Sequence, residues 1–72
     1  MYSENSKYIV IELQKDAEGQ VSNIVTEHST LAEAESKYYF VLAAAAVSSI
    51  PVHSAIIVSE EGFPVRNQCY KH

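Results

Sequence analysis

The stretch Thr30–Ser49, TLAEAESKYYFVLAAAAVSS, constrains the fold more than any other feature of the chain. Thr30 and Glu33 form an S/T-x-x-E capping box, in which the threonine hydroxyl accepts from a backbone N–H of the first turn. Pro51 disfavours the α conformation at the residue before it, so the helix must end by that point. Apolar residues recur at helical spacing. The sequence predicts one helix over 30–49, with a core-facing stripe of Leu31, Ala34, Glu35, Tyr38, Val41, Leu42 and Ala45.

The second half of this helix, residues 38–47, is apolar on every side. A helix that is apolar all round is normally buried all round. The run is well short of the ~20 residues that cross a bilayer, so we do not expect a membrane span. One small sheet cannot cover such a helix completely. The sequence therefore predicts that a second copy of the chain supplies part of the cover.

Four strands are expected around the helix, at residues 7–15, 20–27, 52–59 and 63–70. Their apolar residues tend to alternate, and Gly19 and Gly62 each end an acidic turn between two strands. The predicted fold is α+β with the order ββαββ: two β-hairpins flank one long helix, which covers one face of a four-stranded, mainly antiparallel sheet. We expect residues 1–6 to be a polar N-terminal tail and 7–72 to form a single domain.

Three-residue loops between the strands predict the register of both hairpins. Pro64 cannot donate to a ladder, so the last strand should be an edge strand or start late. A two-residue loop would shift the second register by one residue. The pairs expected are Ile11 with Val25 and Val10 with Thr26 in the first hairpin, and Ile57 with Val65, Ala55 with Asn67 and His53 with Cys69 in the second.

The small size of the chain also favours self-association. A domain of 72 residues buries a marginal core, and a single cysteine excludes an internal disulfide. We expect Tyr8, Val10 and Ile24 on the sheet face opposite the helix, where a partner would cover them. The predicted assembly is a homodimer, with a homotetramer as the alternative, and its interface residues are Tyr8, Val10, Ile24, Tyr39, Phe40 and Ala43.

The net charge of −4 narrows the range of partners. Binding to DNA, RNA or an anionic membrane requires a basic face, so none of these partners is expected. The polar N-terminus has no apolar core of a signal peptide, which predicts a cytoplasmic location. A small anionic ligand held by one or two local cations remains compatible with this charge.

Arg66 is the strongest candidate for such a ligand, since it is the only arginine in an acidic chain. Guanidinium groups bind carboxylates and phosphates with two parallel hydrogen bonds, and neighbouring aromatic rings can stack on a base. An ordinary salt bridge to Glu12, Glu60 or Glu61 is the competing interpretation, and a structural role in core or interface competes for the aromatic residues. The predicted ligand-binding set is Arg66, Tyr70, Tyr39, Lys37 and His53.

No catalytic or metal-binding pattern is present in the sequence. The three histidines, His28, His53 and His72, lack the spacing of a metal site, and we expect no metal and no cofactor. Cys69 opposite His53 is the only pair that suggests a nucleophile and its base, without a third group to orient them. We therefore expect Cys69 to be a buried packing thiol and the protein not to be an enzyme. His53 should lie near the C-terminal end of the helix, where its protonated form would suit the dipole.

The segment AESKYYFVLAAAAVSSIPVHSA resembles a family of small uncharacterised proteins encoded by phages and prophages of Gram-positive bacteria. The resemblance extends loosely over the domain, including the EEG turn and the C-terminal CYKH, and it transfers no catalytic residues. It implies a small phage protein without housekeeping chemistry. The function we expect is a non-enzymatic, homo-oligomeric binding protein, in the sharper form a sponge that sequesters a small nucleotide-type immune signal. The alternative is a protein–protein inhibitor or a virion or tail accessory protein.

Overall fold

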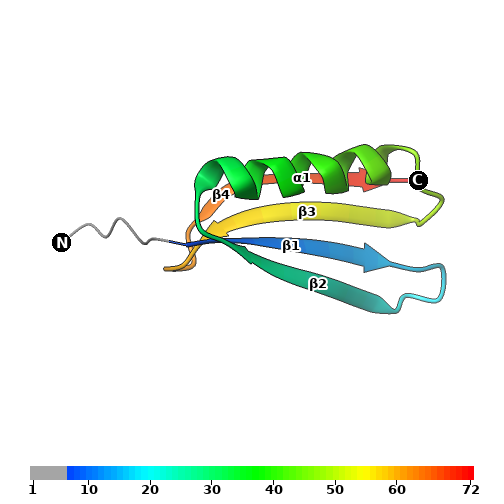
Figure 1. Cartoon of the computed structure of the whole chain (residues 1–72). Helices are drawn as coiled ribbons and strands as arrows, with labels where there is room; N and C mark the ends of the chain where they lie inside the picture. The colour runs from blue at the N-terminus through cyan, green and yellow to red at the C-terminus, as the bar shows by residue number, and fades with distance from the viewer. Residues whose placement is uncertain (1–6) are drawn as a thin grey trace.

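The computed structural model describes residues 7–72, so the predicted tail at 1–6 lies outside the described residues. Four strands and one helix follow in the order ββαββ, which confirms the predicted fold class (Figure 1). The strands form one antiparallel sheet in the order β2-β1-β3-β4. The elements are β1 (Tyr8–Lys15), β2 (Val21–His28), α1 (Leu31–Ala46), β3 (Val52–Ser59) and β4 (Pro64–Lys71).

The helix connects two strands that are not neighbours. β2 and β3 both run antiparallel to β1, which lies between them, so they are parallel to each other. A parallel pair needs a long crossover connection, and α1 provides it by carrying the chain back along one face of the sheet (Figure 1). Sixteen helical residues span ~24 Å and eight strand residues ~26 Å, so the helix matches the strands in length.

The first hairpin has the predicted register, with Ile11 opposite Val25. Its turn is held by Asp16, whose Oδ1 accepts from the backbone N–H groups of Glu18 and Gln20 at 3.0 and 2.8 Å. Gly19 takes φ +87°, a left-handed conformation that glycine adopts without steric cost. The acidic-glycine turn is therefore a local device that sets the register of the whole hairpin.

The predicted register of the second hairpin is wrong beyond its first pair. Val58 lies opposite Pro64 as a three-residue loop requires, but Ile57 pairs with Arg66, because Val65 is an extra residue at a β-bulge. Pro64 has no N–H for the ladder, and a bulge beside it leaves the rest of the strand shifted by one residue. His53 consequently lies opposite Tyr70, and Cys69 lies opposite Ser54.

The N-terminal end of α1 agrees with the predicted cap. Thr30 Oγ1 accepts from the Glu33 N–H at 3.1 Å. The helix ends at Ala46, three residues before the predicted end, because the N–H groups of Val47 and Ser48 turn to carbonyls three residues back. Such bonds tighten the last turn and commonly finish a helix.

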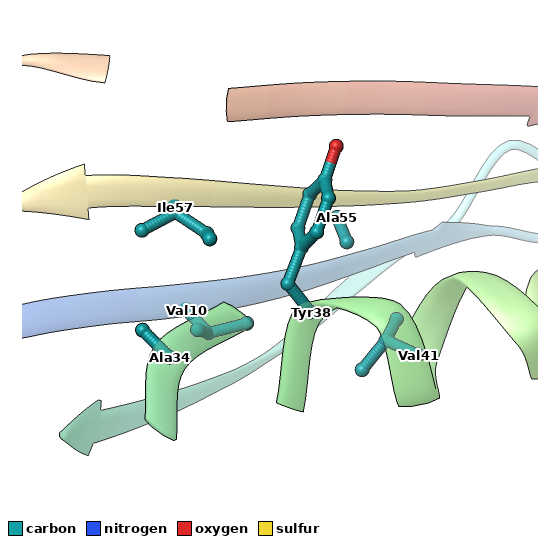
Figure 2. Packing of buried hydrophobic residues seen from close by; sticks show 6 residues of the cluster. All are labelled: Val10, Ala34, Tyr38, Val41, Ala55 and Ile57. Carbon is teal, nitrogen blue, oxygen red and sulfur yellow. The ribbon is translucent and has the colours of Figure 1, made fainter. Parts of the chain in front are cut away.

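The core lies between α1 and the two central strands (Figure 2). The predicted helical stripe is confirmed at its centre, where Ala34, Tyr38, Val41 and Ala45 are buried. Figure 2 shows the Tyr38 ring over Ala55, with the hydroxyl pointing toward β4. Burial raises the pKa of Tyr38 above its ordinary value, so the phenol stays neutral. The helix therefore packs through a narrow stripe of small and aromatic residues.

The predicted assignment of the two sheet faces is wrong. Val10, expected on the free face, is 1% exposed and lies in the core beneath α1, and Tyr8 packs against the same cluster. Ile9, Ile11 and Leu13 alternate with them and occupy the opposite face. Both sets of β1 side chains are apolar enough to form a core, so alternation alone did not decide which set the helix covers.

Candidate functional site

Arg66 lies on the edge strand β4, on the same side of the sheet as α1. Its Nε donates to Glu35 Oε2 at 3.0 Å. The hydrogen bond from Arg66 to Glu35 and the nearby Tyr39 raise the pKa of Arg66, so the guanidinium is always charged. Its side chain is 48% exposed. We expected any ion pair of Arg66 to involve a different glutamate. Glu35 is the partner instead, because its position on the helix faces β4.

Two tyrosines of the predicted ligand-binding set lie on the same side as Arg66. Tyr39 follows Glu35 by one helical turn, is about half exposed and makes an edge-on contact with Tyr38 at 5.1 Å between ring centroids. Tyr70 lies two pairs further along β4 on the same face, and its ring stacks on His72 with 6.4 Å between centroids. Arg66, Tyr39 and Tyr70 thus border one side of the helix, where the cation and the Tyr39 ring are exposed and the Tyr70 ring is partly buried.

The other two predicted ligand residues are separated from this group. Lys37 is two positions from Glu35 and Tyr39, so it points away from them, and its Nζ lies 5.6 Å from the centre of the Phe40 ring. His53 is buried beneath the helix and is 4% exposed. The five predicted residues therefore do not form one site: three border the β4 side, one lies across the helix and one is in the interior.

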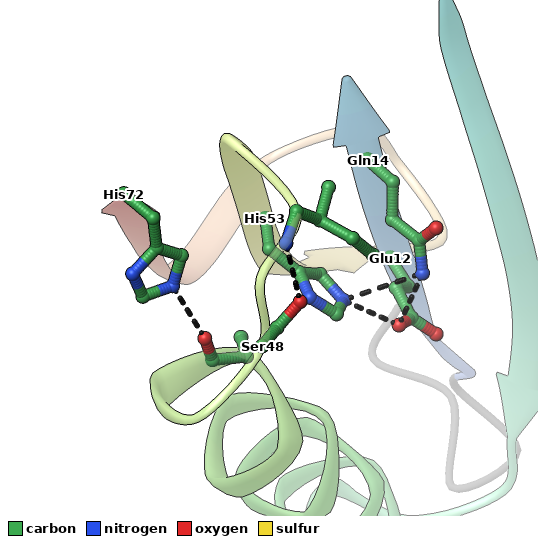
Figure 3. A network of polar contacts seen from close by, with 7 residues as sticks. Glu12, Gln14, Ser48, His53 and His72 are labelled. Atoms are coloured by element: carbon green, nitrogen blue, oxygen red, sulfur yellow. Dashed lines mark hydrogen bonds and ion pairs between the residues drawn. The ribbon is translucent and has the colours of Figure 1, made fainter. Parts of the chain in front are cut away.

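A partly buried polar network on β1 and β3 was missed by sequence reasoning (Figure 3). Glu12 Oε2 accepts from His53 Nε2 at 2.6 Å and from Gln14 Nε2 at 3.1 Å. The two donors are 3.4 Å apart and converge on the same oxygen. Sequence reasoning placed Glu12 and His53 on separate strands of unknown order. The signal that could have found them is the adjacency of β1 and β3, which puts Gln14 directly opposite His53.

The charge of this network centres on Glu12. Burial would raise the pKa of Glu12, but the hydrogen bonds from His53 and Gln14, together with the charge of Lys37, outweigh that effect and leave the pKa lowered. Glu12 is therefore an ionised acceptor at neutral pH. His53 Nδ1 is buried with no hydrogen-bond partner in the described structure. The hydrogen bonds of this network join side chains of β1 and β3, so its evident role is to fix one strand against the other.

The remaining histidines have structural contacts. His72 Nε2 lies 2.8 Å from the carbonyl oxygen of Ala45 in the last helical turn. The contact with the helix end that was expected of His53 is thus made by His72. His28 Nε2 lies 2.9 Å from Thr26 Oγ1 on the same strand. No cluster of three potential metal ligands occurs among residues 7–72.

Cys69 departs from both sequence expectations. It is exposed rather than buried, and it lies opposite Ser54 on the face of the sheet away from the helix. His53 is on the helix-covered face, so the thiol and the imidazole project to opposite sides. The one-residue shift from the bulge therefore removes the only nucleophile–base pair that the sequence suggested.

Three of the residues predicted at an oligomer interface lie on the outside of the helix. Phe40 is 69% exposed, and Tyr39 and Ala43 are exposed as well. Ile24 is on the edge strand β2, on the helix-covered side but beyond the reach of the core, and remains exposed. The second half of the helix is thus not buried all round within one chain.

Comparison with known proteins adds no relative: no protein-family model matches the chain, and neither curated proteins nor solved structures give a significant match. Within residues 7–72, no helix is both long and apolar enough to traverse a membrane.

Proposed function

We propose that the protein is a non-enzymatic, homo-oligomeric binding protein whose ligand is a small anion of the nucleotide type. The observation that carries the proposal is the half-exposed guanidinium of Arg66 beside the exposed ring of Tyr39. Arginine can engage a phosphate through parallel N–H donors, and an aromatic ring offers a surface on which a base stacks. Both groups stand on regular elements, which hold them in position without a ligand.

The ligand would compete with Glu35 for Arg66. The guanidinium has five N–H donors, and the structure records one bond, from Nε to Glu35. A phosphate would bind the remaining donors, and the negative charge of Glu35 beside them would weaken its binding. Tyr70, further along β4, would extend the site toward the C-terminal end of that strand. In the phage setting that the sequence resemblance implies, such a ligand would be a signalling nucleotide of antiviral defence, sequestered without being altered.

Isothermal titration calorimetry with cyclic nucleotides and ADP-ribose derivatives tests the proposal. We expect one ligand to bind, and Arg66→Ala to weaken it about tenfold or more. Lys37→Ala is the matched control: it removes the same charge from the opposite side of the helix and should leave the affinity unchanged. Binding that depends on Lys37 but not Arg66, or no binding across the panel, would refute the assignment. Recovery of unchanged ligand after denaturation distinguishes sequestration from turnover.

A second candidate function is that of a protein–protein inhibitor or a virion or tail accessory protein. The apolar face of the sheet favours it, since an uncovered apolar surface of this size marks a contact with another protein. A pull-down from phage-infected cells separates the two candidates, because an inhibitor retains a host or phage protein in stoichiometric amount and a sponge does not.

A further inference from the structure

The face of the sheet away from α1 is mainly apolar at its centre, where Asn23, Ser54, Asn67 and Cys69 are the other members. Side chains alternate along each strand, so the pairing assigns Val25, Ile11 and Ile56 to one row across three strands of that face. The neighbouring rows continue the surface with Ile9, Val58 and Leu13. In Figure 1 no element of residues 7–72 lies on this side of the sheet. We refer to this surface as the open face; its apolar members are Ile9, Ile11, Leu13, Val21, Val25, Val52, Ile56, Val58 and Pro64.

The size of the open face fits a stable interface between two copies. Four strands at ~4.8 Å spacing and eight residues at ~3.3 Å each give a flat area of about 500 Å². Two such faces together come to ~1,000 Å², which is the lower limit for a specific interface. A hollow of about 270 Å³, lined by Ser54, Ile56, Asn67 and Cys69 among others, lies between β3 and β4 on this face and can receive an apolar side chain.

The charged residues of the open face stand only in its end rows. Lys15 and Lys71 belong to the row at one end, where each is aligned with Val52 of β3. Glu27 belongs to the row at the other end, opposite Ile9, and the acidic turn with Glu60 and Glu61 adjoins that end. The turn with Asp16 and Glu18 also adjoins the lysine end and balances its two positive charges. At the other end Lys7 pairs with Glu27, and Glu60 and Glu61 leave that end net acidic.

This arrangement is complementary to itself in one orientation. A two-fold axis that lies between the sheets and perpendicular to the strands places the lysine end of one copy over the acidic end of the other. An axis parallel to the strands would instead bring the net acidic ends of both copies together, and like charges brought together are unfavourable. Two sheets that pack face to face lie ~10 Å apart, which suits side chains of valine and isoleucine.

We propose that a second copy of the chain covers the open face, with the two sheets packed face to face and their strand ends reversed. The result is a four-layer dimer, helix–sheet–sheet–helix, in which both helices are on the outside. This proposal rests on the homo-oligomeric state proposed above and names its surface. Arg66 and Tyr39 stay exposed in this dimer, because they are on the helix side of the sheet. Loss of the dimer and loss of the ligand can therefore be measured separately.

Sedimentation velocity of the full chain over a range of concentrations tests the proposal. We expect a dimer, and we expect Ile11→Glu to produce a monomer with an unchanged far-ultraviolet circular dichroism spectrum. Phe40→Glu, which adds the same charge to the outer surface of the helix, should leave the dimer intact. A monomeric wild-type protein, or a dimer that Phe40→Glu dissociates and Ile11→Glu does not, would overturn the assignment.

A charge-reversal experiment decides the matter even if Ile11→Glu fails to fold. Lys15 and Lys71 are exposed, so the double change Lys15→Glu with Lys71→Glu removes no core packing. It should weaken the dimer about tenfold or more, and adding Glu27→Lys should recover part of the loss. If dimer affinity is indifferent to both changes, the reversed orientation is wrong. Calorimetry of the same variants should show unaltered ligand binding, which separates this proposal from the ligand site.

Discussion

Both faces of the sheet carry apolar side chains, but α1 covers only one of them. The face under α1 holds Glu12, Gln14 and His53, which share a hydrogen-bonded network next to the core. The open face has a centre of Ile11, Ile56 and other apolar side chains with no cover from residues 7–72. An antiparallel sheet with one wet face normally alternates apolar-in and polar-out. The open face departs from this pattern, because its centre is mainly apolar although no element of residues 7–72 covers it.

The helix, like the sheet, has apolar residues on a covered side and on an uncovered side. Its inner stripe is made of small residues, Ala34 and Ala45, and one large ring, Tyr38, all of them buried. Its outer side includes Phe40 and, just past the end of the helix, Val47, which is 85% exposed. Apolar surface is thus present on both outer sides of the chain, but only the open face is broad and continuous, with two lysines at one end and a net acidic opposite end.

The largest effect on folding stability and dimer affinity should come from replacing one isoleucine on each face by alanine. Ile57→Ala removes a fully buried side chain under the helix and should cost about 2–5 kcal/mol of folding free energy, with the dimer affinity of the folded protein unchanged. Ile56→Ala, one residue away on the open face, should instead weaken the dimer and destabilise the folded chain much less. Urea denaturation and sedimentation on both variants check this, and identical profiles for the two would contradict the distinction between the faces.

A smaller loss should follow removal of the charged acceptor in the network. Glu12→Ala leaves the buried Nε2–H of His53 without an acceptor, which typically costs about 1–3 kcal/mol. Gln14→Ala removes one donor and keeps the Glu12–His53 pair, so it should cost less. Thermal or urea unfolding of the two variants gives the comparison. Equal stability of Glu12→Ala and the wild-type protein would show that the network does not stabilise the fold.

The pH dependence of the unfolding free energy should also show the contribution of Glu12 to stability. Burial raises its pKa, but the bonds from His53 and Gln14 reverse that effect, so the folded-state pKa lies below the ordinary 4.5. The unfolded chain then binds the proton more readily than the folded one. The stabilisation is complete above about pH 4.5 and is lost as pH falls through the lower, folded-state pKa. Unfolding measured from pH 7 to pH 3 should show this decline, and Glu12→Gln should lack that component.

The smallest effect on folding is expected at the exposed ion pair on β4. Glu35→Gln releases Arg66 from a partly exposed contact, and such pairs contribute little to stability. The unfolding midpoint should not move measurably, while affinity for an anionic ligand should rise because the competing carboxylate is gone. Calorimetry with the ligand identified for the wild-type protein checks this. Weaker binding by Glu35→Gln would show that Glu35 acts chiefly by positioning the guanidinium.

Much of the local structure could be predicted because its signals act over a few residues. Thr30 caps its own helix through the Glu33 N–H, and Asp16 with Gly19 closes the first turn in the conformation that its register requires. The register predicted for the second hairpin was wrong from Val65 onward. A β-bulge next to Pro64 cannot be recognised from the alternation of apolar and polar residues. That one residue moved Cys69 to the opposite face from His53 and ended their predicted pairing.

The candidate site was predictable in part. Arg66 stood out as the sole arginine, and its position beside Tyr39 follows once β4 lies along the helix. Its partner Glu35 was visible only as a polar interruption of the core stripe. Lys37 was placed with the site by proximity in sequence, but two residues along a helix separate side chains by more than half a turn.

The sequence by itself determined the elements: one capped helix, four strands, two acidic-glycine turns and the first register, all of which depend on hydrogen bonds and conformations within a few residues. The tertiary structure alone decided which face of β1 is buried. Val10 and Ile11 are nearly equal in hydrophobicity, so the choice depended on where the crossover helix lands and on the pairing of β1 with β3, which brings Glu12 to His53. That choice also left Ile11 and Ile56 on the open face, where a second copy of the chain is the proposed cover.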